Sequence, residues 1–348
     1  METESVQTYN IVGPGAVDWE GLEQKFYELK GYLSEPSLSF SNSSAQRSKQ
    51  RQNVELGLEA IIEVALSQSN VLLQDGDFRG ALEKGLKTLQ FVQEMYGANS
   101  IEQIEPYFLL AKANQYLKRY KQAEEFLSIA NWTIIKNPQT PPHVRAELHQ
   151  NFGLLYVGKG HIDKSIDHLA TSVYYLAILH GADHLITSFG YFNLGNVFAS
   201  QGKMDAATDF LRQVTSIWHS HLLEVVHQEH SFHKPLDDDD DPNHHDSDSI
   251  KENRQINALE DLDEDKIHEA GRMFEQILHI QMDRYGENHI ESGKIFLVLG
   301  LYQWYTGELI KSRDCLEKSA SIMQRVLGDN HLLTLEVRSI MSQIVPEP

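Results

Sequence analysis

The strongest pattern in the chain is a spacing of apolar and small residues that returns every 42 positions. Six segments each begin with an aromatic or aliphatic residue, followed three positions later by alanine or serine. The leading residues are Phe78, Tyr120, Ile162, Met204, Ile267 and Leu309, at steps of 42, 42, 42, 63 and 42. Apolar positions recurring at helical spacing predict amphipathic helices, and a constant stride predicts a repeat architecture.

A small residue stands nine positions before each leader, where a preceding helix would cross the second one. These residues are Ser69, Ala111, Gly153, Gly195, Ala258 and Gly300. A small side chain lets two helices approach closely, and a larger neighbour fills the space beside it. The pattern is that of tetratricopeptide (TPR) repeats. It predicts an all-α, TPR-like superhelical solenoid of about six 42-residue helical hairpins. A C-terminal capping helix from about His331 to Ile344 follows them.

Glycines mark the expected ends of four helices. They are Gly97, Gly181, Gly286 and Gly328, and Asn or Asp follows each of them two positions later. A glycine in the left-handed conformation ends a helix, and Asn or Asp commonly caps the next one. Glu102 and Glu291 stand three residues after Asn99 and Asn288, as in a capping box. Histidines also recur here, at 184, 289 and 331, and their periodicity favours capping over metal ligation.

The single irregular step divides the array. It adds about 21 residues between repeats four and five, within a polar stretch that contains Asp237 to Asp241. Such a sequence cannot bury enough apolar surface to order itself. We expect residues 1–44 to form an N-terminal helix and a Ser-rich linker, 45–226 repeats one to four, 227–250 a disordered acidic and His-rich insertion, and 251–348 repeats five and six with the capping helix. The N-terminal helix should carry an apolar stripe of Trp19, Leu22, Phe26, Leu29 and Leu33.

Charge and cysteine content narrow the function classes. The formal net charge of −20 argues against nucleic acid or anionic membrane as a partner. The single cysteine, Cys315, excludes an internal disulfide and a cysteine-based zinc site. The N-terminal sequence has no basic start followed by an apolar run, and we expect no stretch long enough to span a bilayer. These features favour a soluble protein of the cytoplasm.

Candidate chemistry finds little support in the sequence. We assign no catalytic residue and no cofactor. The run from Gly153 to Gly160 is close to a phosphate-binding loop, but it lacks the Ser or Thr that would hold magnesium and falls in a helix and turn. Seven histidines surround the Asp run, and imidazole with carboxylate can bind zinc or nickel. They are His219, His221, His227, His230, His233, His244 and His245. Their irregular spacing favours a solvated loop, so metal binding remains an alternative and no metal ligand is assigned.

The remaining candidate is a binding site on the surface of the repeats. The first helices of TPR arrays line a concave groove that receives a peptide or a helix. By register, the expected groove residues are Phe108, Lys112, Gln115, Gln150, Leu154, Phe192, Asn196, Leu301 and Trp304. Packing between repeats would explain the apolar members equally well. Only Lys112 is basic, so a clamp for a carboxylate-terminated peptide is not favoured.

Several longer runs carry a more specific resemblance. They begin at Glu105, Gln122, Ala130, Asn151, Gly190 and Ile217 and read EPYFLLAKA, QAEEFL, ANWTIIK, NFGLLY, GYFNLGNVF and IWH. These runs resemble the TPR region of the zinc finger MYND domain-containing protein 12 family, closely over residues 45–225 and more loosely elsewhere. The resemblance implies a protein of the ciliary or flagellar axoneme. Its expected partners are a TPR protein like tetratricopeptide repeat protein 29 and a single-headed inner-arm dynein, which it helps attach to doublet microtubules.

One departure from this family is plain. With Cys315 as its single cysteine, the chain cannot form the family's zinc finger, so zinc is not carried over. A second reading is a motor or cargo adaptor, because the 42-residue step resembles the extended repeats of kinesin light chains. A light chain should carry a heptad coiled coil before its repeats, and residues 1–50 are too short and Ser-rich for one.

Overall fold

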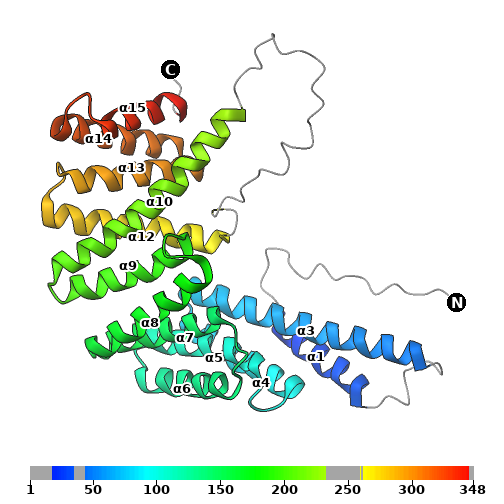
Figure 1. The fold of residues 1–348 in the computed structure, drawn as a ribbon. Helices are drawn as coiled ribbons and strands as arrows, with labels where there is room; N and C mark the ends of the chain where they lie inside the picture. Colours follow the sequence, from blue (N-terminus) through cyan, green and yellow to red (C-terminus); the bar gives the residue numbers. More distant parts are fainter. Residues whose placement is uncertain (1–17, 35–43, 233–258, 260–261, 345–348) are drawn as a thin grey trace, which may run out of the picture. The chain divides into compact units, whose positions relative to one another are not determined.

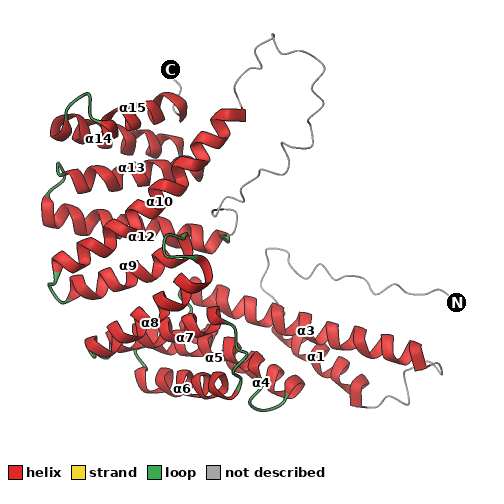
Figure 2. Ribbon diagram, viewed as in Figure 1, coloured by secondary structure: helices red, strands yellow, loops and turns green. Residues whose placement is uncertain are grey.

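The computed structural model describes residues 18–34, 44–232, 259 and 262–344. Within these ranges the chain contains thirteen α-helices, one short 3-10 turn and no strand (Figure 2). The expected all-helical fold is therefore confirmed for the described residues. The chain divides into two compact units, Met1–Thr140 and Pro141–Pro348.

The first unit contains an N-terminal helix and two hairpins (Figure 1). Its elements are α1 (Trp19–Ser34), α3 (Ser44–Gln74), α4 (Phe78–Tyr96), η1 (Ile101–Gln103), α5 (Ile104–Tyr116) and α6 (Tyr120–Lys136). Helices α3 and α4 pair, as do α5 and α6, and α4 also packs on α5. Helix α4 thus contacts its own first helix and the next one, which is how repeat arrays bury a continuous core.

The second unit continues the same arrangement. Its elements are α7 (Pro142–Gly158), α8 (Ile162–His180), α9 (Leu185–Ser200), α10 (Met204–Phe232), α12 (Glu264–Tyr285), α13 (Ile290–Tyr305), α14 (Leu309–Leu327) and α15 (Leu332–Ile344). The hairpins are α7 with α8, α9 with α10, and α13 with α14. Helix α15 packs on α14 as the expected capping helix.

The crossing positions confirm the predicted register. A β-carbon added to Gly153 would lie 2.6 Å from Leu169, and one added to Gly300 would lie 2.7 Å from Leu316. The same construction at Gly195 reaches Leu211 at 2.8 Å. In each case glycine meets a leucine 16 positions later on the second helix. The backbones approach so closely that a side chain would need its neighbour to move.

At three of the four glycine turns a histidine caps the next helix, as the periodicity of these histidines predicted. The Nδ1 atoms of His184, His289 and His331 each accept a backbone N–H from two residues later, at 3.2 Å. The expectation that Asn288 caps α13 is wrong, because its side chain accepts a hydrogen bond from Arg325 of α14. The predicted capping box with Glu291 also fails. That carboxylate pairs with Lys294 at 3.2 Å and with Arg212 at 3.3 Å.

Repeat five is described only in part. Its second helix is α12, but the expected first helix around Ala258 lies outside the described residues apart from Leu259. Helix α10 meanwhile runs for 29 residues, whereas the other second helices have between 17 and 22. It continues to Phe232, through the first residues expected to belong to the insertion. The remainder of the expected insertion, from residue 233 to 250, lies outside the described residues.

The N-terminal helix α1 packs on the first hairpin through the predicted stripe. Leu22 and Phe26 are buried, and Phe26 stacks on Phe91 of α4 with ring centroids 4.4 Å apart. Trp19, Leu29 and Leu33 are partly buried against the same cluster. Helix α1 therefore covers apolar surface of α3 and α4 that would otherwise meet water.

One result differs from the expectation about membranes. The Ser48–Gln74 part of α3 is long and apolar enough to cross a bilayer, with a mean hydropathy of 1.3 over its best window, of which 22% is buried. This criterion uses length and composition alone. The segment carries Glu59 and Glu63, and its apolar side includes the buried residues Leu58, Ile61 and Ala65 of the cluster with α1. Core helices pass the same test, so the feature is weak evidence for a membrane span.

Candidate partner-binding surface

The structure places every expected groove residue on a first helix of a hairpin. Phe108, Lys112 and Gln115 lie on α5 in the first unit. In the second unit, Gln150 and Leu154 lie on α7, Phe192 and Asn196 on α9, and Leu301 and Trp304 on α13. We call the side of the second unit that carries these positions on α7, α9 and α13 the first-helix face.

Two of the predicted residues are not available to a partner. Phe108 is 2% exposed and Leu301 is fully buried. Helix α5 is apolar and buried on nearly all sides, with Ile104, residues 106–111, Ala113 and Asn114 buried, so it presents little surface around Phe108. Leu301 belongs to the core cluster that contains Leu222 and Val226 of α10. The sequence pattern could not separate these core positions from accessible ones.

The remaining predicted residues keep part of their surface. Leu154 is 39% exposed. Gln150 on the same helix is half-buried, as are Phe192 and Asn196 on the neighbouring repeat and Lys112 and Gln115 in the first unit. The accessible part of the first-helix face therefore combines two amide side chains with two apolar ones. Amides can pair with a peptide backbone, and apolar side chains add burial, so this composition suits a protein segment.

The C-terminal part of α10 covers the rest of the first-helix face. Figure 1 shows α10 running obliquely past α12 and α13, and its contacts extend to α15. Leu222, Val225 and Val226 are buried in the same cluster as Leu297 and Leu301 of α13. Trp304 is partly buried against this cluster. The surface predicted at repeat six is therefore occupied by the protein's own chain.

A tryptophan anchors α10 where it leaves its hairpin. Trp218 is fully buried, and its indole Nε1–H donates to the Ser188 hydroxyl of α9 at 2.8 Å. The ring makes edge contacts with Phe189 of α9 and with Phe274 of α12, at centroid distances of 6.1 and 5.1 Å. Residues up to Trp218 are thus fixed by their own repeat and by α12. Beyond Trp218, His221 still donates to the Asp183 carbonyl before α9 at 3.2 Å, and the apolar side chains lie in the cluster with α13.

The polar contact just beyond Trp218 is incomplete. His219 on α10 has its Nε2 atom 3.8 Å from Oε1 of Glu336 on α15. That distance is too long for a hydrogen bond, and the buried nitrogen has no other partner among the described residues. Burial lowers the pKa of His219, although the Glu336 carboxylate opposes this shift. The His219 imidazole is therefore neutral beside the Glu336 carboxylate, and it gains little of the attraction that an imidazolium would gain there.

A second histidine site escaped the sequence analysis. The Nδ1 atoms of His149 on α7 and His168 on α8 are 3.0 Å apart, so one ring donates to the other. Phe152 and Tyr156 stack near His168 at 5.0 and 5.4 Å. Burial, with His168 and Arg145 nearby, lowers the pKa of His149 to about 4. Nothing in the sequence marks this pair, because only the hairpin crossing brings residues 149 and 168 together.

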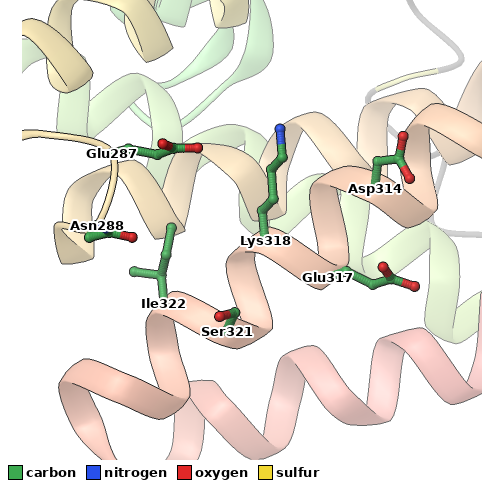
Figure 3. A pocket seen from close by; sticks show the side chains of 7 residues that line it. All are labelled: Glu287, Asn288, Asp314, Glu317, Lys318, Ser321 and Ile322. Carbon is green, nitrogen blue, oxygen red and sulfur yellow. The ribbon is translucent and has the colours of Figure 1, made fainter.

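One hollow lies between the turn that follows α12 and helix α14 (Figure 3). It has a volume of about 440 Å³ and is lined by Glu287, Asn288, Asp314, Glu317, Lys318, Ser321 and Ile322. The hollow is open to solvent, and it is acidic because three carboxylates and one ammonium line it. These groups suit weak contact with a cationic side chain and do not form a nucleophile with an adjacent base.

The described residues contain no group of three or more side chains suited to hold a metal ion. Most of the histidines and aspartates of the expected insertion lie outside the described ranges. The metal-binding alternative therefore stays a prediction.

Comparison with known proteins gives one repeat and several similar folds. A family model described as a tetratricopeptide repeat matches residues 190–217, which span parts of α9 and α10. BtubC (BKLC) from P. vanneervenii has 15% identity, covers 94% of this chain and 94% of its own, and superposes with a TM-score of 0.41. The apo form of RapI has 13% identity, coverage of 92% and 99%, and a TM-score of 0.41.

A third solved structure is described as a Podosopora anserina putative kinesin light chain with nearly identical TPR-like repeats. It has 13% identity, covers 76% of this chain and 96% of its own, and has a TM-score of 0.39. What these names say of function applies to those three proteins and is not carried over to this chain. The hairpins, their crossing register and the matched repeat define the present chain as a TPR-type repeat protein. Such arrays serve as protein-interaction scaffolds, because stacked hairpins present an extended surface.

Proposed function

We propose that this protein is a non-catalytic scaffold that holds protein partners on the accessible part of its first-helix face. The observation that carries the proposal is the repeated crossing, which sets α7 against α8 and α9 against α10 in the same register and leaves Gln150, Leu154, Phe192 and Asn196 partly exposed. Recognition on such a face uses shape, apolar burial and backbone hydrogen bonds. No bond needs to be broken or made in the partner.

The finer proposal places this scaffold in the axoneme of a cilium or flagellum. There it would help attach an inner-arm dynein to doublet microtubules, together with a TPR partner like tetratricopeptide repeat protein 29. The support is the resemblance of the runs beginning at Glu105, Asn151 and Gly190 to the zinc finger MYND domain-containing protein 12 family. The charge of −20 is compatible, because tubulin is acidic and an acidic scaffold would need an intermediary to sit on it.

Affinity purification of the tagged full chain from ciliated cells tests this placement. We expect to recover an inner-arm dynein heavy chain and a TPR partner. Recovery of chaperones or kinesin, without dynein or a TPR partner, would refute the axonemal role. Kinesin in that fraction would instead favour the motor-adaptor reading suggested by the 42-residue step.

A matched pair of variants tests the surface itself. Leu154→Asp places a charge on the accessible first-helix face, and Tyr174→Asp does the same on α8, where the side chain is 62% exposed. We expect the first variant to lose the recovered partners and the second to retain them. Equal loss in both, or retention in both, would contradict binding through the first-helix face.

A further inference from the structure

Helix α10 is built as two parts with different partners. Up to Trp218 it pairs with α9 and meets α12, as a second helix should. Beyond Trp218 it keeps a hydrogen bond to its own hairpin, from His221 Nε2 to the Asp183 carbonyl before α9 at 3.2 Å. Its apolar residues Leu222, Val225 and Val226 lie in the cluster with α13, and His219 faces Glu336 of α15. We call residues 219–232 the α10 extension. Helix α13 is a first helix and α15 is the capping helix. The predicted groove residue Leu301 of α13 lies in the same cluster as Leu222 and Val226, so the α10 extension lies on the side of α13 where an array presents its surface to ligands.

Equivalent positions on three first helices show what the α10 extension does. Gln150, Phe192 and Leu297 occupy one position of the repeat on α7, α9 and α13, and Leu154, Asn196 and Leu301 occupy another. The residues on α7 and α9 are partly exposed, whereas Leu297 is 2% exposed and Leu301 is fully buried. On α5 the first of these positions is Phe108, which is 2% exposed without such a helix. On α13 both positions are buried, in the cluster that contains Leu222 and Val226 of the α10 extension. The same register position is therefore open in one repeat and closed in another.

The α10 extension itself has the pattern of a helical ligand. Leu222, Val225 and Val226 are buried and follow the i, i+3, i+4 spacing of one helix face, while Glu224 and His227 on the other side are exposed. An amphipathic helix laid against an apolar face is a standard mode of protein recognition. Here both the helix and the receiving face belong to one chain.

The fit is poorest at the start of the α10 extension. His219 stands 3.8 Å from the Glu336 carboxylate, and its Nε2 has no hydrogen-bond partner among the described residues. Lysine or arginine at this place could donate directly to Glu336 and stay charged. A foreign helix with such a residue would make a contact that the resident helix lacks.

We propose that the α10 extension is a resident ligand of the protein's own α13 and α15, and that a partner helix displaces it. The partner would be an amphipathic helix with apolar residues at the spacing of Leu222, Val225 and Val226, and with lysine or arginine three positions before the first of them, opposite Glu336. The proposal rests on the scaffold function above and names the chemistry of one partner. The resident helix lowers the apparent affinity for that partner, because only the fraction of molecules with an open face can bind.

Two synthetic peptides provide the probe. Both copy residues 217–232, one with His219→Arg and the other with His219→Glu. Binding to the full chain is measured by fluorescence anisotropy for wild type, for Leu222→Ser, which weakens the resident helix, and for the control Glu224→Ser on its exposed side. We expect the arginine peptide to bind Leu222→Ser at least about tenfold more tightly than wild type. Glu224→Ser should match wild type.

Reversing the charge of Glu336 tests whether the peptide binds where the α10 extension lies. In Glu336→Lys the preference should invert, so that the glutamate peptide binds more tightly than the arginine peptide. A folded Leu222→Ser protein that binds neither peptide more tightly than wild type would overturn the proposal. An unchanged preference in Glu336→Lys would do the same.

Amide hydrogen exchange of the wild-type chain covers the case in which Leu222→Ser does not fold. Residues 219–232 should exchange faster than residues 204–218 and faster still when the arginine peptide is added. Equal protection along α10, unaffected by the peptide, would refute displacement. These measurements use purified components, so their outcome does not depend on the affinity purification from ciliated cells. A negative peptide result would likewise not bear on the axonemal proposal.

Discussion

Helix α1 in the first unit and the α10 extension in the second both cover a repeat from outside the hairpin they touch, but they are held differently. Around α1, Lys30 pairs with Glu94 and Lys87 with Glu23, each at 2.5 Å, and the Tyr27 hydroxyl donates to Glu94 at 3.0 Å. At the α10 extension, His219 faces Glu336 at 3.8 Å. The α1 contact has several ion pairs and hydrogen bonds, whereas the α10 extension has the hydrogen bond from His221 to the Asp183 carbonyl and leaves the His219 Nε2 atom without a partner among the described residues. The comparison indicates a permanent cap at α1 and a replaceable helix at α10.

The largest effect is expected at the centre of the α1 contact. Phe26 is fully buried against Phe91, so Phe26→Ala should lower the free energy of unfolding by about 3–5 kcal/mol. Urea unfolding followed by circular dichroism measures this loss. Tyr32→Ala is the control, because that side chain on the same helix is 39% exposed. Similar losses in the two variants would mean that α1 is not anchored by its stripe.

A smaller effect is expected at the base of α10. Gly195→Leu forces a side chain into the 2.8 Å approach to Leu211, and overpacking should cost about 1–3 kcal/mol. The melting temperature should fall accordingly. Gly202 is unsuitable as a control, because its φ of 69° would add backbone strain. Gly31→Ala suits better, since an added β-carbon there has nothing within 4 Å. An unchanged melting temperature for Gly195→Leu would contradict the close crossing.

The two units should differ in how their stability depends on pH. The pKa of His149 is about 4 in the folded chain, below its ordinary value of 6.5, so the unfolded chain takes up the proton first as pH falls. The stability it contributes is present above pH 6.5 and is lost progressively towards pH 4. We expect a loss smaller than that of Gly195→Leu, because the ring is only half-buried. Urea unfolding of wild type and His149→Gln at several pH values measures it, and an equal pH dependence in both would contradict the assignment.

The α1 contact should resist the same change of pH. Burial would raise the pKa of Glu94, but hydrogen bonds from Lys30, Gln90 and Tyr27 outweigh it and lower the pKa below 4.5. Its contribution is therefore present above pH 4.5 and is lost only as pH falls through the lower folded value. Hydrogen exchange of α1 between pH 6.5 and 4.5, corrected for intrinsic rates, should show constant protection.

The smallest effect is expected for the α1 ion pairs themselves. Lys30 and Glu94 remain 35% and 25% exposed, so Lys30→Met should cost no more than about 1 kcal/mol. The double variant Lys30→Glu with Glu94→Lys should recover part of the loss. A cost as large as that of Phe26→Ala would show that charge, and not apolar burial, holds α1.

Much of the fold was predictable because hairpin crossings leave local marks. Glycine at 153, 195 and 300, each with a leucine 16 positions later, is enough to set the register of the helices. The stripe on α1 was predictable for the same reason, since helical periodicity relates neighbouring residues. The groove residues were predicted less well. Register places Leu154 and Leu301 at equivalent positions, but one is 39% exposed and the other is fully buried.

The amino-acid sequence by itself determined the helices, their turns and the stride at which the hairpins stack, because these depend on residues close together in the chain. The histidine caps of α9 and α13 are local too, because each ring accepts from a backbone N–H two residues later. The tertiary structure alone decided that His149 meets His168 and that α10 continues over α13 and α15, because both depend on how different helices pack. Burial is a property of such contacts, so only the folded chain shows which part of the first-helix face is open.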